Sequence, residues 1–261
     1  MYLEKKLVIL TGSTGALGKA TATKLSNIDC KLALIGRDEL SLKSLEESLS
    51  NGLAEIKAYT HNFSKESDFK NLITKIESDF NNPTSLLINI AAISSAGPFL
   101  EIPPNEFINN LQINTITPIE LTRAVLPSMI FNNYGKIVYV SSGAALRGLP
   151  GFAPYCMSKA ALSNFVESIR SEFCNTNISF LTFYPGTIKS DFNKKTKVFG
   201  PIKFYGSHLG NEPDKIADLL LKAINSNQIG YSQKGPALFA FYLNLLVPKL
   251  IDKYLKRKIA F

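Results

Sequence analysis

Short apolar runs alternate with longer stretches of helical periodicity along most of the chain. The apolar runs are rich in β-branched and aliphatic residues: KLVIL (6–10), KLALIG (31–36), AEIKAYT (54–60), TSLLINIA (84–91), GKIVYVSS (135–142) and ISFLTFYPG (178–186). Strands that alternate with helices form β-α-β units, so this pattern predicts one parallel sheet. Because the runs are almost continuously apolar, we expect helices on both faces of the sheet.

The stretches between these runs have helical spacing, in residues 15–27, 38–50, 64–80, 104–130 and 152–174. No linker, repeat or low-complexity segment divides the chain, which predicts a single domain over residues 1–235. Residues 191–213 break the regularity, because lysines, glycines, prolines and aromatics dominate them. A loop of this length inside a compact domain is usually functional or mobile.

The last segment, residues 236–261, has the pattern of an amphipathic helical tail. Its apolar residues recur at helical spacing: Leu243, Leu246, Val247, Leu250, Ile251, Tyr254 and Leu255. Its basic residues are Lys249, Lys253, Lys256, Arg257 and Lys258. Pro248 is expected to start or kink the helix. Such a tail either lies in the headgroup region of an anionic membrane or packs on the substrate pocket or across a dimer interface, and the sequence leaves both readings open.

The composition, with 45% hydrophobic and 19% charged residues, is ordinary for a globule with a substantial core. No window reaches the roughly 18 consecutive apolar residues that a membrane-spanning helix needs. The start, MYLEKKLVILTG, leads into a glycine-rich turn rather than a cleavage site. We therefore expect a cytoplasmic protein, peripherally membrane-associated if the tail binds lipid.

The net charge of +8 is not gathered into a basic run interleaved with aromatics, so nucleic acid is not expected as a partner. Three cysteines without a C-x-x-C pair predict a reducing compartment and no structural zinc. With only two histidines, a histidine-based metal site is not expected either.

A glycine cluster follows the first apolar run, in VILTGSTGALGKA. Gly12, Gly15 and Gly18 permit a tight turn and close backbone approach. A helix that opens there would direct its free N–H groups and positive dipole end at a phosphate. The position between a strand and a helix, at the head of a β-α-β unit, predicts a dinucleotide site.

The second apolar run ends in Gly36 and Arg37. A dinucleotide fold that prefers NAD normally carries an acidic residue here for the ribose 2′-hydroxyl. The glycine leaves room, and the guanidinium can pair with a 2′-phosphate through forked, charge-assisted hydrogen bonds. The pair predicts a preference for NADP(H), and the alternative is a solvated arginine beside Asp38.

Ser142, Tyr155 and Lys159 stand in an ordered series. The tyrosine and the lysine are four residues apart, so their side chains share a face if this run is helical. The spacing alone does not decide whether they form a proton-transfer site, because two other pairs match Y-x-x-x-K as well: Tyr2/Lys6 and Tyr254/Lys258.

With their neighbours, these residues resemble the classical short-chain dehydrogenase/reductase family, from about Lys6 to Ile224. TGSTGALG resembles T-G-x-x-x-G-x-G, and NIAA (89–92) stands where N-N-A-G is usual. QINTITP supplies Asn114, VYVSS and YCMSK supply the Ser–Tyr–Lys series, and YPGTIKSD resembles P-G-x-I-x-T. Any one motif is modestly specific, but five in the right order identify the family.

The resemblance implies a single Rossmann-like, doubly wound α/β domain with a seven-stranded parallel sheet and a nicotinamide cofactor. Tyr155 would be the acid/base, with its pKa lowered by the nearby ammonium, and Lys159 would also bind the ribose hydroxyls. Ser142 would hydrogen-bond the substrate oxygen, and Asn114 would hold a water that links the lysine to solvent. Cofactor contacts are implied for Gly12, Ser13, Thr14, Gly15, Ala16, Leu17, Gly18, Arg37, Asn62, Asn89, Ala91, Tyr155, Lys159, Pro185, Gly186, Ile188 and Ser190.

The chain departs from the family pattern at a few positions. Ala16 replaces the second glycine of the turn, although Gly15 beside it restores room. Ile90 and Ala92 replace an asparagine and the glycine of N-N-A-G. Asn62 stands where an aspartate commonly contacts the adenine amino group, a bond its side-chain oxygen can still accept. Cys156, next to the tyrosine, is read as a small core residue.

These features predict an NADP(H)-dependent oxidoreductase that acts on a ketone, aldehyde or alcohol of a fairly apolar, lipid-like molecule. The loop at 191–213 would form the substrate wall with Phe192, Val198, Phe199, Ile202, Phe204 and Tyr205. Its lysines (Lys194, Lys195, Lys197 and Lys203) would meet a polar or anionic end of the substrate or be solvated. The alternatives are an NAD-linked alcohol dehydrogenase and a non-catalytic nucleotide-binding regulator. By resemblance, a homodimer or homotetramer is expected.

Overall fold

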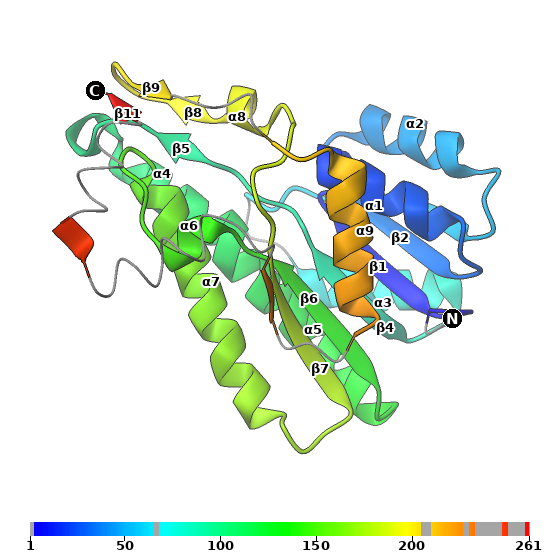
Figure 1. Cartoon of the computed structure of the whole chain (residues 1–261). Coiled ribbons are helices and arrows are strands. Elements are labelled where there is room, and N and C mark those ends of the chain that lie inside the picture. Colours follow the sequence, from blue (N-terminus) through cyan, green and yellow to red (C-terminus); the bar gives the residue numbers. More distant parts are fainter. Residues whose placement is uncertain are drawn as a thin grey trace.

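A computed structural model describes residues 3–64, 68–204, 210–226, 230–232, 247–249 and 259–260. Its centre is a seven-stranded sheet in the order β10-β7-β6-β4-β1-β2-β3 (Figure 1). The strands are β1 (Leu7–Thr11), β2 (Lys31–Gly36), β3 (Glu55–Thr60), β4 (Thr84–Asn89), β6 (Gly135–Val140), β7 (Ile178–Tyr184) and the short edge strand β10 (Gly230–Ser232). All neighbours pair in parallel, which confirms the predicted parallel sheet.

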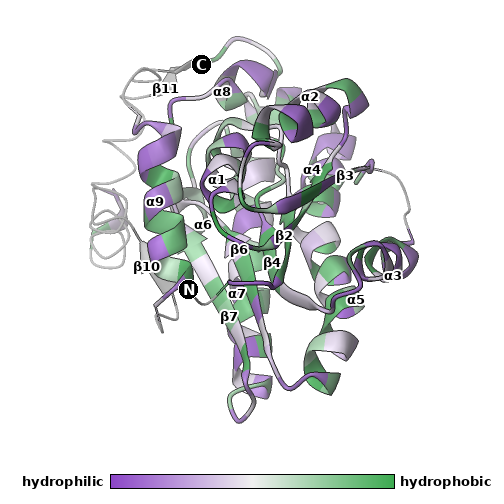
Figure 2. Ribbon diagram, turned by 90° about the vertical axis from the view of Figure 1, so that its right-hand side faces the viewer, coloured by the Kyte–Doolittle hydropathy of each residue, from purple (hydrophilic) through white to green (hydrophobic). Residues whose placement is uncertain are grey.

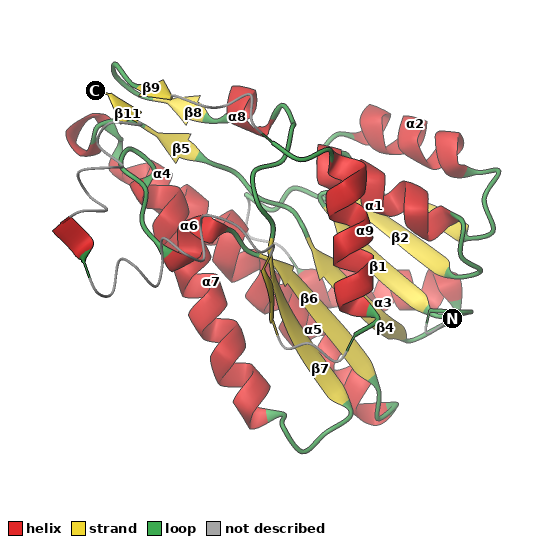
Figure 3. Cartoon of the chain, in the orientation of Figure 1, coloured by secondary structure: helices red, strands yellow, loops and turns green. Residues whose placement is uncertain are grey.

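Helices cover both faces of this sheet (Figure 3). One face packs against α1 (Ala16–Ser26), α2 (Glu39–Leu49) and α9 (Pro213–Ile224). The other packs against α3 (Phe69–Phe80), α5 (Thr117–Phe131) and α7 (Ala153–Glu172). The doubly wound α/β fold is thereby confirmed.

The two cores follow from the strand sequences themselves. Successive side chains of a strand point to opposite faces, so in β1 Val8 and Leu10 join one core and Leu7 and Ile9 the other. Figure 2 shows hydrophobic residues along the central strands and hydrophilic ones on the outer surfaces of the flanking helices. A strand buried on both faces must be apolar at nearly every position, which is why the apolar runs predict the sheet so well.

The helix predicted over residues 104–130 is interrupted. Helix α4 (Pro104–Leu111) passes into a π-helical turn, Gln112–Ile116, before α5 begins at Thr117. The buried side chain of Asn114 bonds the main chain of Ile93, so a tertiary contact stabilises the irregular turn. Turns of this kind occur frequently at functional sites. The single-helix prediction was therefore wrong in this detail.

The segment at 191–213 contains short elements between its loops. Helix α8 (Phe192–Lys195) is followed by β8 (Lys197–Val198) and β9 (Lys203–Phe204). Strand β8 pairs in parallel with β5 (Ser95–Ala96), which follows β4. Residues 205–209 lie outside the described part.

Only parts of the predicted tail are described, residues 247–249 and 259–260. The latter form β11 (Ile259–Ala260), which pairs antiparallel with β9 of the loop at 191–213. The rest of the apolar stripe and basic flank lies outside the described residues. In the part of the chain that is described, no helix has the length and apolar character to cross a membrane.

Candidate active site

The glycine turn joins β1 to α1 through close backbone contacts. Gly12 has φ +68°, and a Cβ there would lie 2.7 Å from the amide nitrogen of Ala91. A Cβ on Gly18 would lie 2.1 Å from the carbonyl oxygen of Gly12. Both positions therefore require glycine, and the turn can bring its main chain close to a ligand.

Helix α1 presents its first turn at this site. Gly15 is the N-cap residue and has no side chain that could accept from the first-turn amides. Ala16 begins the helix, and Leu17 behind it is buried in the core. An uncapped helix start with its positive dipole end suits a pyrophosphate, so these residues fit a dinucleotide cofactor.

Ser13 and Thr14, the other residues of the turn, differ in their environment. Ser13 is buried, and its hydroxyl donates to the carbonyl oxygens of Leu10 and Ile35, at 2.7 Å and 3.2 Å. These bonds fasten the turn between β1 and β2. Thr14 is only partly buried.

Arg37 follows β2 directly and is exposed. The next residue, Asp38, caps α2 by accepting from the amide of Ser41 at 2.8 Å. Hydrogen bonds from Ser41 hold the pKa of the Asp38 carboxyl below its ordinary value, and the Arg37 guanidinium acts in the same direction. The aspartate is thus occupied in capping, while the guanidinium stands at the carboxyl end of the sheet, where this fold binds its ligands.

The ends of β3 and β4 complete the cofactor side. The Asn62 side-chain oxygen accepts from the amide and the hydroxyl of Ser64, at 3.1 Å and 2.7 Å. Asn89 is buried at the end of β4, and neither polar atom of its amide has a hydrogen-bond partner among the described residues. The amides of Ile90 and Ala91 donate to Thr11 on β1, which brings this segment beside the glycine turn. An unpaired buried amide is uncommon and marks a place where a ligand can bond.

The segment after β7 carries Pro185, Gly186, Ile188 and Ser190. Main-chain hydrogen bonds hold it beside the start of α9. The Lys189 amide donates to the Asn211 carbonyl at 2.9 Å, and the Asn211 amide donates to the Thr187 carbonyl at 2.8 Å. The Ser190 hydroxyl accepts from the amide of Phe192, the first residue of α8. This bond connects the cofactor side with the substrate side.

Asn114 lies at the centre of the π-helical turn and is fully buried. Its side-chain oxygen accepts from the Ile93 amide at 2.8 Å, and its nitrogen donates to the Ile93 carbonyl and to the Ser158 hydroxyl, both at 2.9 Å. The side chain is thereby occupied. A water held by this residue would therefore bond its main chain rather than its side chain.

Ser142 lies close enough to Tyr155 to lower the pKa of its phenol. Ser142 ends β6 as the N-cap of the short helix α6 (Gly143–Leu146), and its Oγ accepts from the Ala144 amide at 3.1 Å. Tyr155 lies in the first turn of α7. Burial raises the pKa of the Tyr155 phenol to about 12, although the side chain of Ser142 lowers it. Desolvation is thus the largest influence on this pKa in the structure.

Lys159 follows one turn later on α7 and is only 2% exposed. Its Nζ donates to the Val140 carbonyl oxygen at 2.9 Å, beside Ser142. Burial lowers the pKa of the Lys159 ammonium to about 8. The structure thus places the serine, the tyrosine and the lysine at the carboxyl end of β6.

Two neighbours of the tyrosine bear on its surroundings. Phe192, from α8, has its ring centroid 5.9 Å from that of Tyr155. Cys156 is buried, and its sulfur accepts from the amide of Leu149 at 3.3 Å. The cysteine therefore packs in the structure, as predicted. Among the described residues, no three His, Cys, Asp or Glu side chains gather into a metal-binding cluster.

Sequence reasoning missed Ser158 and Glu106. Ser158 joins the Asn114 side chain to α7, and its hydroxyl donates to the Tyr155 carbonyl at 2.8 Å. Glu106 is a buried carboxylate on α4. Ser158 lies within YCMSK, directly before Lys159, and this position could have drawn attention to it. Glu106 belongs to no recognisable motif.

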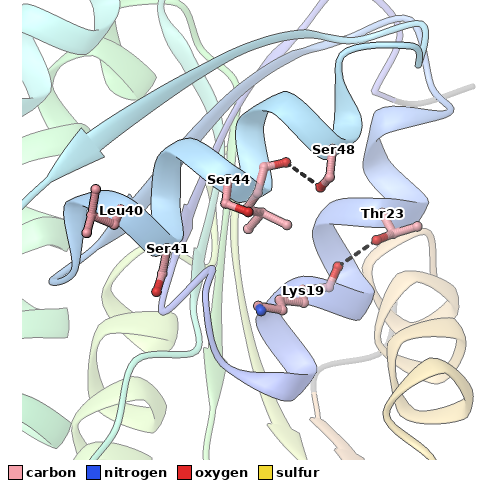
Figure 4. A pocket seen from close by; sticks show the side chains of 7 residues that line it. Lys19, Thr23, Leu40, Ser41, Ser44 and Ser48 are labelled. Carbon is pink, nitrogen blue, oxygen red and sulfur yellow. Dashed lines mark hydrogen bonds between the residues drawn. The ribbon is translucent and has the colours of Figure 1, made fainter.

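A hollow between α1 and α2 contributes nothing to this site (Figure 4). It is lined by Lys19, Thr23, Leu40, Ser41, Ser44, Leu45 and Ser48. The Thr23 and Ser48 hydroxyls donate to carbonyls of their own helices, as the dashed lines show. No lining residue belongs to the glycine turn or to the Ser–Tyr–Lys series.

Comparison with known proteins agrees with this arrangement. The chain matches the short chain dehydrogenase family over residues 6–198. It is 30% identical over 261 residues to dehydrogenase/reductase SDR family member 7B of Xenopus laevis, covering 95% of this chain and 80% of that protein. It is 30% identical over 191 residues to a short chain dehydrogenase of Pseudocercospora fijiensis, covering 72% of this chain and 62% of that protein.

Solved structures share the fold. A short chain dehydrogenase/reductase from Burkholderia phymatum in complex with NAD aligns with a TM-score of 0.85 at 19% identity, over 96% of both chains. A metagenomic short-chain oxidoreductase in complex with NADP aligns with a TM-score of 0.73 at 22% identity, over 89% of this chain and 98% of that one.

The fold, the site and the sequence match define the class: the chain belongs to the short-chain dehydrogenase/reductase family. Members of this family are oxidoreductases, and this chain is one of them.

Proposed function

We propose that the protein reduces a ketone or aldehyde on a fairly apolar molecule with NADPH, and that Tyr155 supplies the proton. The observation that carries this proposal is that Ser142, Tyr155 and Lys159 gather at the carboxyl end of β6, where Lys159 Nζ donates to the Val140 carbonyl oxygen at 2.9 Å. The reduced nicotinamide supplies a hydride to the carbonyl carbon when bound. The remaining task of the protein is to hold the carbonyl oxygen and protonate it.

The raised pKa suits the acid role. With a pKa of about 12, the Tyr155 phenol is protonated at neutral pH and can donate to the oxygen as charge develops there. The Ser142 hydroxyl, at the end of β6, would donate to the same oxygen and stabilise its charge. The positive charges of Lys159 and of the oxidised nicotinamide would favour the phenolate that remains.

The positions of Arg37 and Asp38 support the preference for NADP(H). Arg37 is exposed at the end of β2, and the neighbouring carboxylate of Asp38 caps α2. A 2′-phosphate would thus meet a cation there, and a 2′-hydroxyl would lack the acidic acceptor that NAD-preferring sites provide.

The first experiment is a fluorescence titration with NADPH and, in parallel, NADH. We expect NADPH to bind tightly and NADH to bind at least tenfold more weakly. Arg37→Ala should lower the ratio of the NADH to the NADPH dissociation constant, because it removes the cation that would pair with the 2′-phosphate. Arg123→Ala, a change at an exposed arginine on α5, is the control.

An unchanged ratio in Arg37→Ala refutes the NADP(H) preference, and tight NADH binding favours an NAD-linked alcohol dehydrogenase. If neither nucleotide binds, the protein is a regulator rather than an enzyme.

The segment at 191–204 supports an apolar substrate. Phe192 packs on Tyr155, and Val198 on β8 is an exposed apolar side chain of the same segment. Two of the loop lysines already have partners, because Lys194 pairs with Asp191 at 2.9 Å and Lys197 with Glu106 at 2.7 Å. These contacts therefore support a substrate with an apolar body more than one with an anionic end bound by the loop lysines.

Two further parts of the proposal concern the whole protein. The basic tail would attach the protein peripherally to an anionic membrane surface of the cytoplasm. The protein would also form a homodimer or homotetramer through its long helices. Exposed apolar side chains on α5 and α7 support this association: Ile130, Phe131 and Met157.

A further inference from the structure

A buried carboxylate lies outside the catalytic set, on the first turn of α4. Glu106 is 3% exposed. One carboxylate oxygen accepts from the Ser95 hydroxyl at 2.5 Å, and the other accepts from Lys197 Nζ at 2.7 Å. Burial alone would raise the pKa of the Glu106 carboxyl, but the bonds from Lys197 and Ser95 outweigh it and hold that pKa below its ordinary value. The group is therefore a charged carboxylate that bonds α4 to β5 and to β8.

The same contacts fasten one end of the substrate loop. Strand β8 pairs with β5 over two residues, with Lys197 opposite Ser95. The Lys197 amide donates to the Ser94 carbonyl at 3.1 Å, and the Phe199 amide donates to the Ala96 carbonyl at 2.8 Å. So short a pair of strands is weak by itself. The side-chain bonds to Glu106 are thus a large part of what holds β8 in place.

The other end of this short segment touches the catalytic tyrosine. Phe192 packs its ring against that of Tyr155, and Thr196 between the two ends is buried and donates to the Phe192 carbonyl at 3.1 Å. Figure 1 shows α8 and β8 in one run beside β5 and α4. A displacement of β8 would therefore move the aromatic wall over the phenol.

We propose that Glu106 is a positioning residue: through Lys197 and Ser95 it fixes segment 192–199 over Tyr155 and so sets the affinity for the substrate without touching it. Removing the lysine would leave a buried, unpaired carboxylate, which is more costly than removing the whole pair. The anchoring of the loop stands independently of the reaction, and its effect on substrate affinity rests on the proposed function.

Hydrogen exchange of the full-length protein tests the anchoring. The variants are Glu106→Gln, Lys197→Met and the double variant, with Lys194→Met as the control because that lysine forms an exposed ion pair on the same loop. In Lys197→Met, exchange of the peptide covering residues 195–199 should become faster by on the order of tenfold. Adding Glu106→Gln should partly restore protection, because it removes the unpaired charge.

The proposal would be overturned if the peptide exchanged no faster in Lys197→Met and Glu106→Gln than in the control Lys194→Met. It would also be overturned if the effects of the two substitutions on the exchange rate were purely additive in the double variant. An NADPH titration and a thermal melt show that each variant is folded. If Glu106→Gln does not fold, the comparison of Lys197→Met with Lys197→Arg decides, since the arginine should retain the protection.

Kinetics then test the consequence for the substrate. With a carbonyl that the wild type reduces, Glu106→Gln and Lys197→Met should raise KM several-fold while kcat and NADPH affinity change less, and Lys197→Arg should restore KM. A fall in kcat at constant KM would contradict the positioning role. If the wild type shows no turnover with any carbonyl, the proposed function fails while the exchange result stands by itself.

Discussion

At the scale of single residues, the chemistry depends on what burial does to two side chains four positions apart. Burial raises the pKa of the Tyr155 phenol and lowers that of the Lys159 ammonium, so both shifts favour the uncharged forms. A neutral phenol is the form that can give up a proton. Under the proposed function, the desolvated site would hold this acid ready before the cofactor binds.

Replacement of the tyrosine tests its role directly. Tyr155→Phe removes the acidic hydroxyl and keeps the ring, so turnover should fall by about 10²–10⁴-fold. The NADPH dissociation constant should change little in a fluorescence titration. Undiminished turnover would rule out the phenol as the proton donor.

The buried lysine predicts an unusual dependence of stability on pH. Its folded-state pKa is about 8, against 10.5 when it is unfolded, so the unfolded state binds more protons between these values. The contribution of Lys159 to stability is therefore unfavourable below about pH 8 and improves as pH rises toward 10.5. Lys159→Met should stabilise the protein at pH 7 by on the order of 1–3 kcal/mol, at the cost of activity.

Denaturant unfolding at pH 7 and pH 10 measures this effect. The wild type should gain more stability between the two values than Lys159→Met does. Burial also lowers the pKa values of Lys6 and Lys136, but both proteins contain these lysines. The difference between the two changes in unfolding free energy therefore reports on Lys159 alone. Parallel pH curves for the two proteins would mean that the lysine is not desolvated.

At the scale of elements, the turn between β1 and α1 depends on backbone contact that no side chain can replace. The Gly18 position lies against the Gly12 carbonyl, so a methyl group there cannot be accommodated unless the turn moves. The same backbone would hold the pyrophosphate. Stability and cofactor binding should therefore be lost together.

Gly18→Ala tests this coupling. It should destabilise the protein by about 1–3 kcal/mol in a thermal melt and weaken NADPH binding at least tenfold. Gly148→Ala is the matched control, because a Cβ at Gly148 would meet no atom within 4 Å. Wild-type NADPH affinity in Gly18→Ala would show that the turn does not bind the cofactor.

The π-helical turn between α4 and α5 is a second element that carries function. It lets Asn114 reach both main-chain groups of Ile93 and the hydroxyl of Ser158 at once. A regular helix would rotate the side chain away from one of these partners. The irregular turn therefore fixes the segment after β4 against α7, which carries Tyr155 and Lys159.

At the scale of the whole molecule, the end of the chain returns to the substrate side. Ile259 and Ala260 pair with Phe204 and Lys203 on β9. These two residues of the tail thus contact the loop at 191–213. The prediction of membrane binding concerns residues 250–258, which carry most of the basic flank.

Truncation after Gly235 tests the membrane reading. The full-length protein should sediment with anionic vesicles at low salt and detach at high salt, because the attraction is electrostatic. The truncated protein should stay in the supernatant. Equal sedimentation of both proteins would contradict a role of the tail in membrane binding.

The sequence by itself determined the features that depend on local pattern. Continuous apolar runs specify strands buried on both faces, and the glycines at 12 and 18 specify a turn that only glycine can form. The spacing of Tyr155 and Lys159 specifies one helical face, which α7 provides. Each of these properties is decided within a few residues, where stereochemistry and periodicity suffice.

The tertiary structure decided what depends on residues far apart in the chain. Glu106 and Lys197 are separated by 91 positions, and no periodicity connects them. The pairing of β8 with β5, the partners of Asn114 and the balance of burial over charge at Tyr155 likewise arise only when distant segments pack. Desolvation and ion pairing depend on the complete surroundings of a group, and folding alone supplies them.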